Sequence, residues 1–295
     1  MRRLLLCATL LASVSLHAQD TNFDAIQIKV HDVVPGVYFL EGEGGNIGVS
    51  VGDDGVFIID DQFAALSERI KTALARLNPA PVKFVFNTHF HFDHSEGNEN
   101  FATDGAIIVA HEKARDRMTR EHFFSILNTS QQAYGPEGLP KLTFTEEMTL
   151  HFNGNTVNVR HFGPAHTDTD AVYHFVEANV IHTGDVFRTV GYPGVDGNNG
   201  GTVQGTIEAL QALVELAGPN TKILPGHGVV VTRAEVAAFR DLTVDLQKRF
   251  TDLVRQGMTL EQVVAARPVA DLEAKYGSPE RLIPAFYNAV KAELE

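Results

Sequence analysis

The first half of the chain is a succession of short apolar runs interrupted by turn signals. Three strand-like runs come first, separated by Gly-rich and Asp-Asp-Gly turns, and this spacing predicts an antiparallel meander. Ile70, Ala73, Leu74 and Leu77 then recur with helical spacing, and a buried strand follows them. The expected elements of this half are strands over residues 37–40, 47–51, 56–59, 82–86 and 106–110 and helices over residues 64–77 and 112–120.

The second half repeats this order of strands followed by a helix. The expected elements are strands over residues 148–152, 156–162, 171–176, 180–183 and 222–224 and a helix over residues 206–217. Thr232 with Glu235 and Thr259 with Gln262 form capping-box patterns, which predict the starts of C-terminal helices. The pattern therefore predicts an α/β fold with two mixed sheets flanked by helices.

Residues 1–18 have the pattern of a secretory signal peptide. Two arginines precede an apolar run over residues 4–12, and the small residue Ala18 precedes a polar pair. The run is too short to span a bilayer, so we expect cleavage without a membrane anchor and a periplasmic or secreted protein. Residues 19–295 are expected to form a single domain that includes the C-terminal helices. Because the one cysteine, Cys7, lies in the signal, a metal site of the mature protein must use His, Asp and Glu.

Composition and charge limit the kinds of molecule that the protein is expected to bind. Apolar residues make up 44% of the chain and charged residues 21%, which is typical of a globular protein. Lys and Arg number 24 against 37 Asp and Glu, a formal net charge of -13. A polyanion such as DNA or RNA is repelled by such a surface, so we expect a small-molecule substrate and no nucleic acid. The sequence does not define the oligomeric state.

A cluster of polar side chains directly follows the predicted buried strand at residues 82–86. His89, His91 and Asp93 alternate and can point the same way from an extended chain, and His94 joins them where the backbone turns. Burying four such groups beside two phenylalanines is costly unless an ion compensates. The loop therefore predicts a metal site, with a structural histidine cluster as the alternative.

Three more isolated residues stand in turns right after predicted strands: His166, Asp185 and His227. With the first loop they give seven candidate ligands, whereas one zinc ion takes about four. Two ions bridged by Asp185 use the whole set, as in other two-metal hydrolytic sites. Zinc is expected, although iron or manganese also accepts His and carboxylate ligands.

In these residues the sequence resembles the metallo-β-lactamase superfamily, over about residues 33–238. The His-x-His-x-Asp-His signature at residues 89–94 carries the resemblance, together with the ordered series His166, Asp185 and His227. The resemblance implies an αββα sandwich with the site at one edge. It implies one zinc on His89, His91 and His166, a second on Asp93, His94 and His227, and Asp185 between them. Asp60 resembles the family's carboxylate that orients a metal-binding histidine, with a turn aspartate as the alternative.

Such a site implies hydrolysis by a zinc-bound hydroxide that attacks a carbonyl, with the metals polarising the carbonyl and stabilising the leaving group. Asp93 is the expected catalytic residue, because its carboxylate can orient the hydroxide and take its proton. His182 is a candidate for contact with the ligands from behind, or an ordinary buried histidine. Residues 120–134 contain an apolar stretch that is expected to form a lid over the site, to pack on the sheet or to make an oligomer contact.

The substrate is less defined than the reaction. The export signal favours a β-lactamase, and Arg188 stands where many β-lactamases pair a cation with the substrate carboxylate. Asn198 and Asn199 are further candidate substrate contacts, although an ordinary solvated Arg and loop Asn fit as well. An aspartate at position 185 is instead typical of lactonase-like and glyoxalase II-like relatives, which favours lactone or thioester hydrolysis. A non-catalytic binding module and a nuclease are the remaining alternatives.

Overall fold

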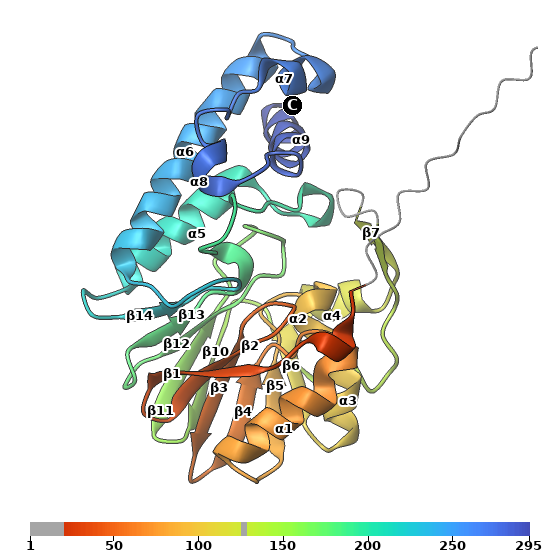
Figure 1. The fold of residues 1–295 in the computed structure, drawn as a ribbon, viewed down its shortest axis with the longest axis vertical. Coiled ribbons are helices and arrows are strands. Elements are labelled where there is room, and N and C mark those ends of the chain that lie inside the picture. Colours follow the sequence, from red (N-terminus) through yellow and green to blue (C-terminus); the bar gives the residue numbers. More distant parts are fainter. Residues whose placement is uncertain (1–20, 125–128) are drawn as a thin grey trace, which may run out of the picture.

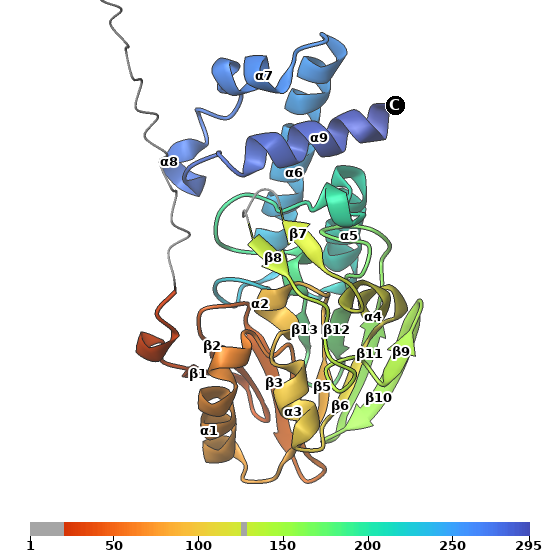
Figure 2. The same cartoon turned by 90° about the vertical axis from the view of Figure 1, so that its right-hand side faces the viewer.

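The computed structural model describes residues 21–124 and 129–295. Two β-sheets lie face to face, and helices cover their outer faces (Figures 1 and 2). The predicted signal peptide lies outside the described residues. Within the described part of the chain, every helix is too short or too polar to cross a bilayer.

The larger sheet has seven strands in the order β1-β2-β3-β4-β5-β6-β9. Strands β1 to β4 are antiparallel, and β5, β6 and β9 continue the sheet in parallel, as the expected meander and strand–helix–strand units require. The strands are β1 (Lys29–Val34), β2 (Val37–Glu41), β3 (Ile47–Gly52), β4 (Gly55–Ile59), β5 (Val82–Phe86), β6 (Ile107–His111) and β9 (Leu142–Phe144).

The smaller sheet has five strands in the order β10-β11-β12-β13-β14. Its first four strands are antiparallel, and β14 joins β13 in parallel. The strands are β10 (Glu147–Phe152), β11 (Asn155–Arg160), β12 (Val172–Phe175), β13 (Val180–His182) and β14 (Lys222–Leu224). A separate hairpin of β7 (His122–Phe124) and β8 (Thr129–Gln131) stands apart from both sheets.

The alternation of side chains in each strand explains the layers. In β4, Phe57 and Ile59 face the core between the sheets, whereas Val56 and Ile58 face the opposite side, and all four are fully buried. Helices α1 (Ser67–Leu77) and α3 (Asn98–Thr103) supply apolar side chains to that outer core, and α2 (Phe92–Ser95) and α4 (Glu112–Met118) follow β5 and β6. The layer order is therefore αββα, as expected.

Helices from the last third of the chain form the layer outside the smaller sheet, where the first two pack on the strands and the later ones pack on these two helices and on one another (Figure 2). They are α5 (Val203–Leu216), α6 (Arg233–Arg255), α7 (Leu260–Ala266), α8 (Glu273–Tyr276) and α9 (Leu282–Leu294). Both predicted capping boxes are present, at the starts of α6 and α7. Helices α6, α7 and α9 extend beyond the ends of the strands (Figure 1). Short 3-10 turns complete the fold: η1 (Phe23–Ala25), η2 (Ala64–Leu66), η3 (Gly184–Val186) and η4 (Gly197–Asn199).

A buried histidine and a partly buried one lie in contact between the two sheets. His111 ends β6 and His161 follows β11, with ring centroids 4.2 Å apart. His111 Nε2 donates to the Thr145 carbonyl at 2.8 Å, and its Nδ1 accepts from the Lys113 amide, so the ring is held neutral. Burial, and then the neighbouring His161, lower the pKa of His111 to about 4, and burial lowers the pKa of His161.

This pair is expected to make stability depend on pH. A folded-state pKa below the unfolded value means that the unfolded chain binds more protons, so stability falls as the pH drops from about 6.5 towards 4. We expect His111 to account for about 2–3 kcal/mol of that loss. Urea unfolding at pH 7.5 and 4.5 measures it, and His111→Gln should flatten the pH dependence. A pH dependence of stability in H111Q as steep as that of the exposed control His151→Gln would contradict this expectation.

Candidate metal centre

The loop after β5 places four polar side chains at the edge of the larger sheet. His89 and His94 are fully buried, His91 and Asp93 are partly buried, and Phe90 points away into an apolar cluster. The turn of α2 brings His94 back beside His89, with ring centroids 4.3 Å apart. The extended segment and the following turn therefore direct these groups to one point, as expected from their spacing.

Loops from the smaller sheet bring the other three predicted residues to the same point. His166 lies beyond β11, Asp185 lies in η3 after β13, and His227 follows β14. His166 Nε2 lies 3.1 Å from His91 Nδ1, and His227 Nε2 lies 3.3 Å from His94 Nε2. The structure thus brings all seven predicted side chains together at one edge of the two-sheet sandwich.

These side chains form three overlapping groups whose ligand atoms lie within 4.8 Å of one another. They are His89 with His91 and His166, His89 with His94 and Asp185, and Asp93 with His94 and His227. Each of these groups of imidazole and carboxylate donors is capable of binding a metal ion.

Asp185 lies between the histidines of the two ends of the site. Its Oδ1 is 3.4 Å from Nε2 of His94 and 3.4 Å from Nε2 of His227, while its Oδ2 is 3.7 Å from Nε2 of His166. Asp93 Oδ2 lies 3.3 Å from His227 Nε2 on the other side. The Asp185 carboxylate therefore faces histidine nitrogens from both halves of the molecule.

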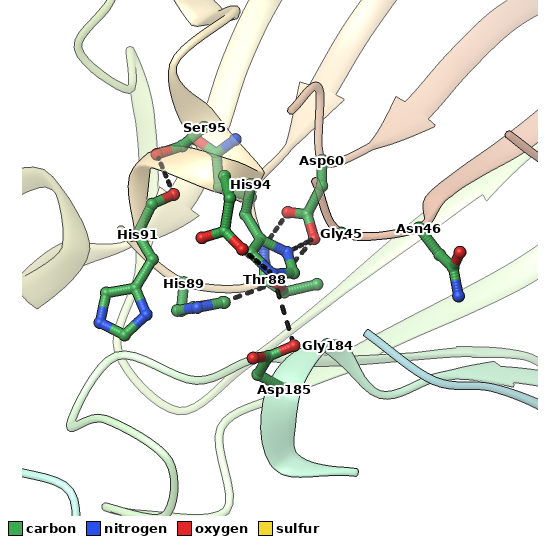
Figure 3. Close-up of polar contacts among 12 residues, drawn as sticks. Gly45, Asn46, Asp60, Thr88, His89, His91, His94, Ser95, Gly184 and Asp185 are labelled. Carbon is green, nitrogen blue, oxygen red and sulfur yellow. Dashed lines mark hydrogen bonds and ion pairs between the residues drawn. The ribbon is translucent and has the colours of Figure 1, made fainter. Parts of the chain in front are cut away.

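Asp60 supports the site from behind, as Figure 3 shows. Its carboxylate accepts from Nδ1 of His94 at 2.7 Å, from the Thr88 amide at 2.7 Å and from the Thr88 hydroxyl at 2.8 Å. Because the hydroxyl proton goes to Asp60, the Thr88 oxygen is free to accept from His89 Nδ1 at 3.0 Å. Both rings therefore keep a proton on Nδ1, and each ring in its neutral form presents an unprotonated Nε2 to the site.

His182 supports a turn rather than a ligand ring. Its Nε2 donates to the Asn46 carbonyl at 3.1 Å, and its Nδ1 accepts from the Gly184 amide at 3.2 Å, directly before Asp185. Gly45 and Gly226 allow the backbone to pass close to the candidate ligands. A Cβ on Gly45 would overlap the His94 ring, and one on Gly226 would overlap Asp185. His182 thus fixes the backbone that carries Asp185.

The donor set fits a metal ion. His89 Nε2 and Asp185 Oδ1 are buried and have no hydrogen-bond partner, which is costly unless a cation compensates. The 3.1 Å between His91 Nδ1 and His166 Nε2 is close to the separation of about 3.3 Å that two nitrogens have on a tetrahedral zinc. A site made of nitrogen and oxygen donors suits zinc, iron or manganese.

Burial and neighbouring charges set the protonation states of the histidines and aspartates in the site. Burial lowers the pKa of His89 and lowers that of His166 to about 4, so both rings are neutral. Burial raises the pKa of Asp185, but Arg188 and then His227 hold it well below its ordinary value. Burial acts in the same way on Asp93, whose pKa His94 and His227 lower. In spite of its burial, the carboxylates of Asp93, Asp60 and Asp185 raise the pKa of His94. The site therefore offers neutral His89 and His166 rings and ionised carboxylates.

A cavity of about 450 Å³ opens onto these side chains. One wall carries His91, Asp93, His166, Asp185 and His227, and the loop of residues 188–198 forms a second. The third comes from the C-terminal segment: Tyr276, Ser278, Arg281, Leu282 and Ala285. Sequence reasoning missed this wall, because no local pattern places residues 276–285 near the histidines.

The predicted substrate contacts differ in position. Arg188 and Asn198 line the cavity, but the Arg188 guanidinium is paired with the Asp185 carboxylate. Asn199 is 5% exposed, and its amide contacts Asp196 and Arg117. In this structure, Arg188 and Asn199 thus have partners of their own.

Only part of the predicted lid, residues 120–134, lies within the described residues. Phe124 of β7 lines the cavity and packs edge-on against the His91 ring at 5.0 Å, whereas Phe123 is 58% exposed. Residues 125–128 lie outside the described residues. Packing beside the site is therefore observed for Phe124, and a lid motion remains a prediction.

Comparison with known proteins agrees with the αββα layers. The family model of the metallo-beta-lactamase superfamily matches residues 40–227. The chain therefore belongs to this superfamily, and the protein is a metal-dependent hydrolase.

Individual relatives are distant. A hydroxyacylglutathione hydrolase of Brucella anthropi is 26% identical over 232 residues, which cover 72% of this chain and 76% of that protein. A metallo-beta-lactamase from Pontibacter korlensis has a similar structure, with TM-score 0.62 and 18% identity over 74% of this chain and 99% of that one. A double mutant of the sec-alkyl sulfatase PisA1 gives TM-score 0.68 and 17% identity, over 88% of this chain and 50% of that one. These two structures share the fold with this protein.

Proposed function

We propose that the protein is a dinuclear zinc hydrolase that cleaves the acyl bond of a small thioester or lactone. The observation that carries the proposal is Asp185, whose carboxylate faces His94 and His227 through one oxygen and His166 through the other. The proposed ligands are His89, His91 and His166 for one ion and Asp93, His94 and His227 for the second, with Asp185 shared.

Bound zinc of this kind lowers the pKa of a water molecule to about 7 and polarises a substrate carbonyl. Asp93 is placed to orient that water and accept its proton, because its carboxylate is 26% exposed and lines the cavity beside His227. The apolar side chains of Val190, Tyr192 and Val195 line the same cavity and would shield the acyl group from bulk water. These residues are expected to bind substrate and direct the attack.

Two observations favour a thioester or lactone over other acyl bonds. The relative from Brucella anthropi is named for the hydrolysis of a hydroxyacylglutathione, a thioester. Position 185 is an aspartate, which is typical of the lactonase-like and glyoxalase II-like branches of the superfamily. Both point to an oxygen or sulfur leaving group.

β-Lactam hydrolysis is the second candidate, and Arg188 is the observation that favours it. This arginine lines the cavity, and its Nε is buried without a hydrogen-bond partner. A substrate carboxylate would satisfy this donor. The pairing of Arg188 with Asp185 weighs against this role, because the guanidinium is already neutralised.

A hydrolysis panel separates these substrates. With zinc-loaded protein, we expect kcat/KM for a 2-hydroxyacyl-glutathione thioester or a γ-lactone to exceed that for nitrocefin by about 10²-fold, a difference of about 3 kcal/mol. Faster turnover of nitrocefin would make the protein a β-lactamase. Two bound zinc ions without turnover of any substrate would instead favour a binding module.

We also propose that the protein acts in the periplasm or outside the cell, after removal of residues 1–18. The two arginines, the short apolar run and Ala18 support this proposal. Mass spectrometry of the protein from a periplasmic fraction tests it, and a mature chain that keeps Met1 in the cytoplasm would contradict it.

A further inference from the structure

The loop between η3 and α5, which lines the cavity, also contacts two of the histidines. The Gly194 carbonyl lies 3.0 Å from Nδ1 of His166, and Asp196 Oδ2 lies 3.0 Å from Nε2 of His91. The Asp196 amide also donates to the His166 carbonyl at 2.8 Å. One short loop therefore contacts two side chains that are 75 positions apart in the sequence.

These contacts fix which nitrogen of each ring carries a proton. A carbonyl and a carboxylate can only accept, so His166 Nδ1 and His91 Nε2 must donate. In the neutral rings, His166 Nε2 and His91 Nδ1 are then both lone pairs, and they face each other at 3.1 Å. Two facing lone pairs repel unless a cation lies between them, so this loop prepares the pair for an ion.

A second set of contacts holds Asp196 in place. The Asn199 amide donates to Asp196 Oδ2 at 2.6 Å, and its oxygen accepts from Arg117 Nη1 at 2.9 Å. Arg117, on α4, also forks to the two oxygens of Asp168 at 2.7 and 2.8 Å. Asp168 follows His166 by two positions. The contacts of Asn199 and Arg117, which we call the brace, therefore connect the His166 loop, and His91 through Asp196, to helix α4.

We infer that Asp196 is a positioning residue for the proposed metal site, which fixes the tautomer and orientation of His91 and is itself held by Asn199 and Arg117. The inference rests on the proposed function. It explains why Asn199 is buried with both ends of its amide in contact, rather than free to bind substrate. Carboxylates that accept from a ligand histidine raise its basicity and its affinity for metal.

The test is zinc affinity, measured by competition with a chromophoric chelator, in the full chain. Asp196→Asn removes the charge with little change of shape, and we expect the affinity for the zinc ion proposed on His89, His91 and His166 to fall about 10–100-fold. Asn199→Ala leaves Asp196 in place and should cause a smaller loss in the same direction. Asp196→Glu should restore part of the affinity. Circular dichroism establishes that each variant is folded.

Asp116→Asn is the matched control, because this exposed carboxylate lies on α4 outside the brace. Its zinc affinity should equal that of the unaltered protein. Zinc affinity in D196N equal to that of D116N would overturn the inference and leave the proposed function standing. An unaltered protein that binds no zinc would overturn both.

Discussion

Removal of metal from the purified protein is expected to abolish hydrolysis and to lower its midpoint of thermal unfolding. Without a cation, His89 Nε2 and Asp185 Oδ1 remain buried and unpartnered, and His91 and His166 direct lone pairs at each other. An ion present at about 1,000 times its dissociation constant stabilises the fold by about 4 kcal/mol. For a chain of this size, that corresponds to a midpoint shift of about 10 °C.

Chelation with dipicolinate followed by dialysis provides the metal-free protein, and elemental analysis measures what remains. Zinc, manganese and iron(II) added back one at a time should restore activity to different extents, which identifies the metals that support catalysis. Protein held at the same pH without chelator is the control. Full hydrolysis by protein with no measurable bound metal would contradict the assigned chemistry.

Much of the fold was predictable because central strands of each sheet, such as β4 and β13, are buried on both sides. In β4 the apolar run from Val56 to Ile59 is continuous, since each residue faces either the core between the sheets or the layer of helices. Strand β1 was not predicted, because it is a partly exposed edge strand with Lys29, His31 and Asp32 among its residues. Helix α3 begins Asn-Glu-Asn, and β9 has three residues, so neither has a local pattern.

The candidate site was predictable because its residues stand in turns directly after strands. His89, His91, Asp93 and His94 stand together after a strand, and the other three groups follow strands of the second sheet. The contacts behind them were not predictable, since His91 and Asp196 are 105 positions apart and no spacing rule relates them. Asp196 stands in a glycine-rich loop, which the sequence suggested only as a source of polar donors.

The C-terminal segment extends the site beyond the residues that define the superfamily. The family match ends at residue 227, yet Tyr276, Ser278 and Arg281 line the cavity. Contacts hold this wall in place: the Tyr192 hydroxyl donates to the Gly277 carbonyl, and the Glu293 carboxylate accepts from the Val203 amide at the start of α5. Substrate selection is therefore expected to depend on a part of the chain that the metal ligands do not specify.

Replacement of Asp60 by alanine is expected to lower the free energy of unfolding by about 3–5 kcal/mol, since breaking a buried hydrogen-bonded charge pair leaves its partners unsatisfied. Asp60 is fully buried and accepts three hydrogen bonds, two from Thr88 and one from His94. Its φ of 66° is also a conformation that alanine adopts at a cost. Urea unfolding of metal-free protein measures the change apart from any loss of metal.

Two variants make this measurement specific to Asp60. Asp60→Asn keeps the size of the side chain and one acceptor oxygen, so it should lose about half as much stability. Asp53→Ala changes an exposed aspartate in the turn before β4, and it should stay within about 0.5 kcal/mol of the unaltered protein. A D60A protein as stable as D53A would show that Thr88 and His94 find other partners. The Thr88–His89 contact would then not depend on Asp60, and the orientation of both rings would need another cause.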